Sequence, residues 1–160
     1  DVYKRQEQVF DSDLVSTKDE MVNEAQLEFT ILSSLKPFAE FLNDEYVLCR
    51  QVPLSPFKPS DMDRADICLY SVTTPLKNGT VPNVIIELKK TKAKKEAYNQ
   101  VVRYLRWIEN ITTPDEFKEV KAYIIAPEIG RIKKAKVDIK YSDKIQMYAL
   151  GNSEFVSLVD

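Results

Sequence analysis

Histidine is absent from this chain of 160 residues. Its absence excludes Ser-His-Asp and Cys-His hydrolases, His-Glu-x-x-His zinc enzymes and any nuclease with a histidine base. Cys49 and Cys68 are the only cysteines. They are too few for a disulfide framework, and without histidine they cannot complete a four-ligand structural zinc site within one chain. Any chemistry must therefore use carboxylates, lysine, tyrosine, serine or a hard metal ion.

Long apolar runs are also absent, and none approaches the roughly 20 residues that span a bilayer. The N-terminus is charged and has no apolar segment typical of a secretory signal. We therefore expect a cytoplasmic protein with no membrane partner. The chain begins with Asp1 rather than Met, which suggests a fragment or a processed product, and 1–6 (DVYKRQ) resemble translated adapter sequence. We expect little structure in 1–18 and a single domain over 19–160.

Charge is nearly balanced overall but uneven along the chain. The net charge is -2, from 25 acidic and 23 basic residues. Up to Leu48 there are 11 acidic and 4 basic residues, and the remainder has 14 acidic and 19 basic residues. The basic residues gather at 89–95 and 131–136. Each run is as compatible with a solvated surface as with contacts to a nucleic acid.

Hydrophobic spacing predicts two helices and five strands. A long helix over 19–42 can be capped by Ser16, Thr17 or Asp19, and Pro37 kinks or divides it. A second helix is expected over 94–108. Strands are expected over 46–52, 65–72, 84–90, 120–126 and 145–150. Three strands followed by a crossover helix and another strand imply a mixed sheet flanked by helices, which is an α/β sandwich.

The third expected strand carries the residues of most chemical interest. Strand alternation puts Glu87 and Lys89 on the same face. Burying a carboxylate and an ammonium on an apolar strand is costly. The neighbouring strand offers Asp66 among apolar residues, where it can face Glu87. Two converging carboxylates make a hard oxygen site suited to Mg²⁺ or Mn²⁺, and a nearby lysine can stabilise phosphate charge or steer the nucleophile.

Each of these residues also has a structural interpretation. Glu87 and Lys89 on an exposed edge strand would be a surface ion pair of little consequence. Asp66 could cap a turn after Asp61 and Asp63. Taken singly, each residue favours that interpretation, but the ordered set favours a metal site.

The order of Asp66, about twenty residues, and then Glu87-x-Lys89 resembles the signature of the PD-(D/E)XK nuclease superfamily. Ala65 stands where the motif has proline. Gln100 and Tyr104, one helical turn apart, resemble the Gln-x-x-x-Tyr motif of its RecB-like branch. The resemblance covers roughly 19–150. It is closest to NucS-type endonuclease domains and to the N-terminal nuclease domains of type I restriction subunits, and it implies a restriction-endonuclease-like core.

The superfamily's opening helix carries an acid, and here three candidates share one face: Glu20, Glu24 and Glu28. Their four-residue spacing leaves the choice open. We choose Glu24 because of its Asn23-Glu24 context, with Glu28 second.

The resemblance implies a metal-dependent deoxyribonuclease in which a Mg²⁺-activated water hydrolyses DNA phosphodiester bonds, in restriction or repair. The implied catalytic set is Glu24, Asp66, Glu87, Lys89, Gln100 and Tyr104. Asp66 and Glu87 would hold Mg²⁺, with Mn²⁺ as a substitute. DNA-backbone contacts would come from Lys90, Lys92, Lys94 and Arg103.

Several alternatives remain open at the level of the sequence. The chain could be a non-catalytic DNA-binding module, or a regulatory domain of a larger ATP-driven machine, although it contains no P-loop. No helix-turn-helix or zinc motif supplies sequence readout. Specificity would then come from loops, from a homodimer partner or from a larger multidomain chain. Endonuclease and exonuclease activity are not distinguished.

Overall fold

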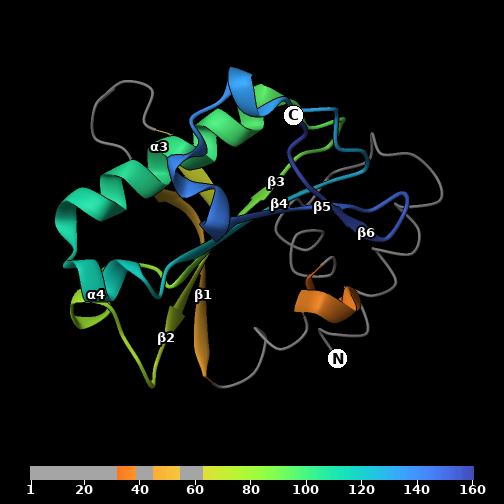
Figure 1. Ribbon diagram of the computed structural model, residues 1–160. Coiled ribbons are helices and arrows are strands. Elements are labelled where there is room, and N and C mark those ends of the chain that lie inside the picture. The colour runs from red at the N-terminus through yellow and green to blue at the C-terminus, as the bar shows by residue number, and fades with distance from the viewer. Residues whose placement is uncertain (1–31, 39–44, 55–62) are drawn as a thin grey trace. The chain divides into compact units, whose positions relative to one another are not determined.

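The computed structural model describes residues 32–38, 45–54 and 63–160 (Figure 1). The chain divides into two units, Asp1–Tyr46 and Val47–Asp160. In the first unit, 32–34 are α-helical and 36–38 form a 3₁₀ turn. The break between them falls beside Pro37, as expected of a residue that removes a helical hydrogen bond. The rest of the expected helix over 19–42, with Glu20, Glu24 and Glu28, lies outside the described residues, as does the expected N-terminal segment 1–18.

A six-stranded sheet in the order β1-β2-β3-β4-β5-β6 forms the framework of the fold. β2 and β3 are antiparallel, as are β5 and β6, whereas β4 runs parallel to both β3 and β5. The sheet is therefore mixed, as the sequence predicted. Its strands are β1 (Tyr46–Pro53), β2 (Arg64–Ser71), β3 (Val84–Leu88), β4 (Lys121–Ala126), β5 (Ile145–Ala149) and β6 (Glu154–Val156).

A single long helix, α3 (Lys95–Ile111), connects β3 to β4 and lies across one face of the sheet (Figure 1). This is the expected crossover helix, extended by one turn at its C-terminal end. α3 buries one stripe of side chains, as amphipathic spacing requires. The stripe consists of Ala97, Tyr98, Val101, Val102, Tyr104, Leu105 and Ile108. The fold class predicted from the sequence, a mixed sheet flanked by helices, is thus confirmed.

Short helical segments complete the connections. The four-residue helix α4 (Pro114–Phe117) follows α3 and is closed by a capping box between Thr113 and Glu116. The sequence analysis missed α4 and β6. Three 3₁₀ segments are η2 (Lys77–Gly79), η3 (Lys134–Lys136) and η4 (Ile139–Lys144). No helix in the described ranges is long and apolar enough to cross a membrane.

The core under α3 is built from alternate positions of neighbouring strands. Cys68, Ile85, Ile124 and Met147 belong to the same buried cluster as the inner face of α3. The intervening residues of β3, including Ile86, are buried as well. β3 therefore lies in the middle of the sheet with both faces covered, and any charged side chain on it is held away from water. This position gives Glu87 its unusual environment.

Candidate active site

The C-terminal end of β3 brings two carboxylates to one face of the sheet. The antiparallel register pairs Ile67 with Ile86. One step further along each strand, Asp66 lies opposite Glu87, and directly opposed residues point to the same face. The main-chain N–H of Asp66 donates to Glu87 Oε1 at 3.4 Å. The two acids therefore lie on one face of the sheet, as expected for a lone acid on the strand next to Glu87.

Two hydrogen bonds from neighbouring strands hold the carboxylate of Asp66 in place. The main-chain N–H of Leu88 donates to Asp66 Oδ2 at 2.7 Å. Gln51, from the neighbouring strand β1, donates its side-chain amide to Asp66 Oδ1 at 3.2 Å. Both carboxylate oxygens of Asp66 therefore accept a hydrogen bond from a different strand, which fixes the plane of the carboxylate.

Glu87 is the most deeply buried acid among the described residues, with only 2% of its surface exposed. Burial and the like charge of Asp66 raise the pKa of Glu87 to about 7, although the ammonium of Lys89 acts in the opposite direction. Desolvation disfavours the charged form, and a neighbouring carboxylate does the same. The pair thus carries an excess of negative charge that the described protein groups neutralise only in part.

Lys89 follows β3 and lies on the same face as Glu87. Its Nζ is 3.2 Å from Glu87 Oε2 and donates to Gln100 Oε1 at 2.9 Å. An ammonium has three N–H donors, so these two contacts leave a third to reach a bound group. Lys89 is one-third exposed, whereas Glu87 is buried. The lysine therefore lies at the mouth of the site and connects the acid pair to α3.

A chain of hydrogen bonds continues from Lys89 into the helix. The side-chain amide of Gln100 donates to the hydroxyl of Tyr104 at 2.9 Å, and that hydroxyl donates to the main-chain oxygen of Arg64 at 3.0 Å. Gln100 and Tyr104 thus share a helical face, as their spacing predicted. Their surroundings differ, because Gln100 is partly exposed while Tyr104 is fully buried.

Tyr104 is buried beneath the helix face that it shares with Gln100. Its pKa is raised above the ordinary range, first by burial and then by the charges of Glu87, Asp63 and Asp66. The hydroxyl remains protonated and acts as a link between Gln100 and the main chain of β2. Tyr104 is therefore closed to solvent, and its hydroxyl contacts Gln100 and the main chain of β2.

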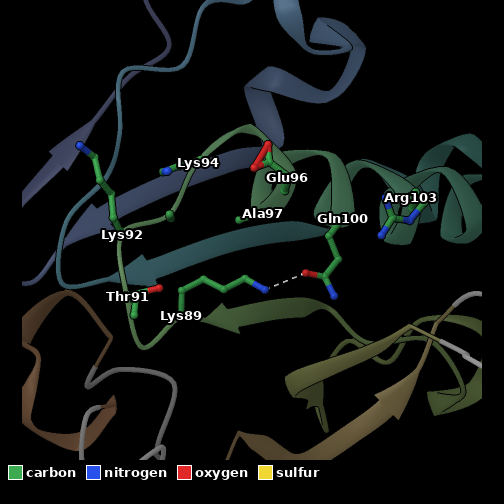
Figure 2. A pocket seen from close by; sticks show the side chains of 9 residues that line it. Lys89, Thr91, Lys92, Lys94, Glu96, Ala97, Gln100 and Arg103 are labelled. Atoms are coloured by element: carbon green, nitrogen blue, oxygen red, sulfur yellow. Dashed lines mark hydrogen bonds between the residues drawn. The ribbon is translucent and has the colours of Figure 1, made fainter. Parts of the chain in front are cut away.

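An open pocket of about 650 Å³ begins at Lys89 and extends along the start of α3 (Figure 2). Figure 2 shows Lys89 extending toward Gln100, with Lys92 and Lys94 on the adjoining loop. Four cations and one acid, Glu96, are among the residues that line it. The lining is Lys89, Thr91, Lys92, Ala93, Lys94, Glu96, Ala97, Gln100 and Arg103. Lys90, which the sequence grouped with these, is exposed but does not line the pocket.

The lysine-bearing loop is fastened to the loop that follows β4. The main-chain N–H of Ala93 donates to Glu128 O at 2.9 Å, and that of Gly130 donates to Ala93 O at 2.7 Å. A Cβ at Gly130 would lie 3.2 Å from Ala93 O, so the absence of a side chain permits this close approach. Both main-chain groups of Ala93 are therefore hydrogen-bonded to the loop after β4, which restrains the backbone that carries Lys92 and Lys94.

Arg103 lies at the far end of the pocket. Its Nε donates to Asp63 Oδ2 at 2.8 Å, and nearly half of its side chain remains exposed. A guanidinium has five N–H donors, so this ion pair leaves others free to contact an anion in the pocket. Asp63, which the sequence analysis treated only as a turn residue, sets the direction of Arg103.

No protein-family model matches the chain, and no curated protein matches it. Among solved structures, it is similar to a repair endonuclease from Pyrococcus abyssi, at 18% sequence identity and a TM-score of 0.49. That match covers 84% of this chain and 49% of the other. It is also similar to EndoMS in a complex with double-stranded DNA, at 14% identity and a TM-score of 0.44. That match covers 72% of this chain and 40% of the other. The chain thus spans half the length, or less, of either protein.

The donor set at the acid pair fits a hard divalent cation. Carboxylate oxygens are the ligands that Mg²⁺ prefers, and this ion commonly keeps several waters while bound by one or two carboxylates. Asp66 and Glu87 supply two such groups on one face. Among residues 32–38, 45–54 and 63–160 there is no set of three or more acids, cysteines or histidines that could hold a metal. Further ligands would have to be water or groups from outside these ranges, where Glu24 lies.

Gln51 is the site residue that the sequence analysis missed. An amide within an expected strand carries no signal of its own, and its contact with Asp66 depends on how β1 and β2 pair. Four of the predicted catalytic residues lie together where β3 ends and α3 begins: Asp66, Glu87, Lys89 and Gln100.

Proposed function

We propose that this chain is a metal-dependent deoxyribonuclease that hydrolyses phosphodiester bonds of DNA. The observation that carries the proposal is the acid pair: Asp66 and Glu87 oppose one another on a buried face, with Lys89 Nζ 3.2 Å from the second acid. Placing a second acid beside the buried Glu87 is costly for stability. A divalent cation held by Asp66 and Glu87 would offset this cost, and such a pair has no evident value to a purely structural domain.

The expected cation is Mg²⁺, with Mn²⁺ as a substitute, and Asp66 and Glu87 are the residues proposed to hold it. A bound divalent cation lowers the pKa of a coordinated water and polarises a phosphoryl oxygen. The hydrogen bonds from Leu88 and Gln51 orient Asp66 for this task. Because groups that orient metal ligands are fixed before the ion arrives, little rearrangement is needed at binding.

Lys89 is proposed to act on the phosphate or on the attacking water. A charged ammonium cannot bind a cation. The ammonium of Lys89 lies between Glu87 and Gln100, and its third N–H is left to donate to a phosphate or a water. Hydrolysis forms one new P–O bond from water, breaks one ester P–O bond, and leaves a proton on the departing oxygen. Negative charge grows on the phosphoryl oxygens as this happens, and a fixed ammonium stabilises it. Gln100 holds Lys89 Nζ at 2.9 Å.

DNA is the proposed substrate because of the charges in the adjoining pocket. Lys92, Lys94 and Arg103 line the same pocket as Lys89. If one DNA phosphate lay at the acid pair, the adjacent phosphates of the same strand would be within reach of these cations. Such contacts add affinity without sequence preference. We include the exposed Lys90, which lies outside the pocket lining, as a fourth contact to the DNA backbone. This proposal also includes a role in restriction or DNA repair, a homodimer or a larger multidomain chain, and a cytoplasmic location.

Incubation of supercoiled plasmid with the protein in Mg²⁺, Mn²⁺ or EDTA tests the proposal. We expect nicked or linear DNA in either metal and intact plasmid in EDTA. Plasmid that is retarded in a gel but never cut, in either metal, would instead support a non-catalytic DNA-binding module.

A further inference from the structure

Gln51 has a backbone conformation that side-chain-bearing residues seldom adopt. Its φ is 54°, although it lies within β1. This left-handed region is disfavoured for residues with a Cβ because of steric contacts. Such residues persist where the surrounding structure holds them, and they gather at functional sites. The same residue contacts the carboxylate of Asp66.

The conformation has a geometric effect on β1. Successive side chains of a regular strand point to opposite faces. Here Val52 packs against the core cluster beneath α3, while the side chain of its neighbour Gln51 reaches Asp66 Oδ1 at 3.2 Å, on the face that Asp66 shares with Cys68 and Glu87. A left-handed residue interrupts the regular alternation of a strand, and in β1 this interruption falls at the residue whose amide contacts Asp66.

A second hydrogen bond secures the main chain at this point. Arg64 Nη1 donates to Gln51 O at 3.3 Å, and the main-chain oxygen of Arg64 accepts from the buried hydroxyl of Tyr104. Gln51 is therefore connected through β2 to α3, the helix that also holds Lys89 through Gln100.

We propose that Gln51 is a positioning residue that orients the carboxylate of Asp66 for metal binding, and that the left-handed backbone exists to deliver its amide there. This inference rests on the proposed metal-dependent function. The amide of Gln51 and the main-chain N–H of Leu88 each bond to one oxygen of Asp66, and together they fix the direction in which its carboxylate points. Groups that orient a metal ligand typically contribute about 10- to 100-fold to metal affinity or activity.

Gln51→Gly separates the two roles that this residue could have. Glycine adopts a positive φ without strain, so the backbone conformation is kept while the amide is lost. Asn78→Gly is the matched control, because Asn78 also has a positive φ, of 57°, but lies exposed in η2. Thermal unfolding reports on the fold, calorimetric titration with Mn²⁺ reports on metal affinity, and plasmid nicking reports kcat and KM.

We expect Gln51→Gly to unfold at the parent temperature or above, to bind Mn²⁺ about tenfold more weakly, and to lose kcat with little change in KM. Asn78→Gly should match the parent in metal affinity and turnover. Parent-like Mn²⁺ affinity and kcat in Gln51→Gly would overturn the inference and leave the metal-nuclease proposal standing. If the parent neither binds Mn²⁺ nor nicks plasmid, the proposed function fails and the role of Gln51 fails with it.

Discussion

Asp66 and Glu87 lie at directly opposed positions of two antiparallel strands, with the N–H of Asp66 donating to Glu87 Oε1 at 3.4 Å. Two carboxylates so placed repel one another, and burial raises the cost. The pKa of Glu87, about 7, expresses that cost. A protein tolerates such a pair where it has a use, so this relationship directs each of the tests below.

Lys89→Ala should separate chemistry from metal binding. Removing an ammonium 3.2 Å from Glu87 eliminates a competing positive charge, so Mn²⁺ affinity should be unchanged or slightly higher. Turnover should fall about 100-fold or more, as is typical for a group that stabilises transition-state charge. Lys121→Ala, which removes an exposed lysine at the opposite end of the neighbouring strand, is the control. Loss of Mn²⁺ binding in Lys89→Ala would argue that the lysine only supports the fold.

The stability of the metal-free protein should depend on the ionisation of Glu87. Its pKa is raised from 4.5 to about 7 in the folded state. The folded state therefore keeps a proton that the unfolded state releases, and stability is lost as the pH rises from about 4.5 through about 7. The full loss is on the order of 3 kcal/mol.

Glu87→Gln mimics the protonated acid and should be free of this loss. Urea unfolding in EDTA should find the variant more stable than the parent at pH 8 and similar to it below pH 4.5. Glu128→Gln, which replaces an exposed glutamate, should show no such difference. If the unfolding free energies of the parent and of Glu87→Gln differed by the same amount at every pH in this range, the buried-acid interpretation would be contradicted.

Tyr104→Phe should weaken the hydrogen-bond chain without opening the core. The ring stays packed, while the hydroxyl bonds to Gln100 and to Arg64 O are lost. We expect a loss of about 1 kcal/mol in the free energy of unfolding and a modest fall in cleavage. Gln100→Ala should reduce cleavage more, because Gln100 contacts Lys89 directly.

Tyr98→Phe provides the control for that experiment. Tyr98 lies on the same helix, and its hydroxyl is buried without a hydrogen-bond partner among the described residues. Removing it should cost nothing or stabilise the fold, because a buried unsatisfied group is lost. Equal effects of Tyr104→Phe and Tyr98→Phe on stability and on cleavage would contradict the positioning role of Tyr104.

Lys92→Ala and Lys94→Ala should weaken DNA binding without altering cleavage chemistry. Each loss of a phosphate contact lowers the slope of log affinity against log salt by about 1. The weakening should be the same for unrelated DNA sequences, because backbone contacts carry no sequence information. Fluorescence anisotropy in EDTA at several salt concentrations measures this, with Lys121→Ala as control. A salt slope equal to that of the parent would exclude these lysines from the interface.

Much of the fold was predictable because its central elements carry regular patterns. The apolar spacing of α3 and the run in β3 are long enough to define helix and strand, and alternation alone put Glu87 and Lys89 on one face. α4 was missed although Thr113 and Glu116 form a recognisable capping box. β6 has only three residues, too few to show any period.

The parts of the site that escaped the sequence depend on tertiary structure. The role of Gln51 requires the pairing of β1 with β2 and a positive φ, neither of which the sequence marks. Tyr104 shares a helical face with Gln100, but their spacing cannot show that Gln100 lines the pocket while Tyr104 is buried. The choice of Glu24 stays a prediction, because that residue lies outside the described ranges.

The central claim is that Asp66 and Glu87 form a metal site whose occupancy is required for DNA cleavage. Asp66→Asn tests it most directly, because asparagine keeps the side-chain shape and an oxygen acceptor for the N–H of Leu88 while removing the charge. Mn²⁺ titration and plasmid nicking should be measured on the same samples of parent and variant. We expect the parent to bind Mn²⁺ and nick plasmid, and Asp66→Asn to lose both while unfolding at or above the parent temperature. A folded Asp66→Asn that binds Mn²⁺ and cuts DNA at the parent rate would contradict the account.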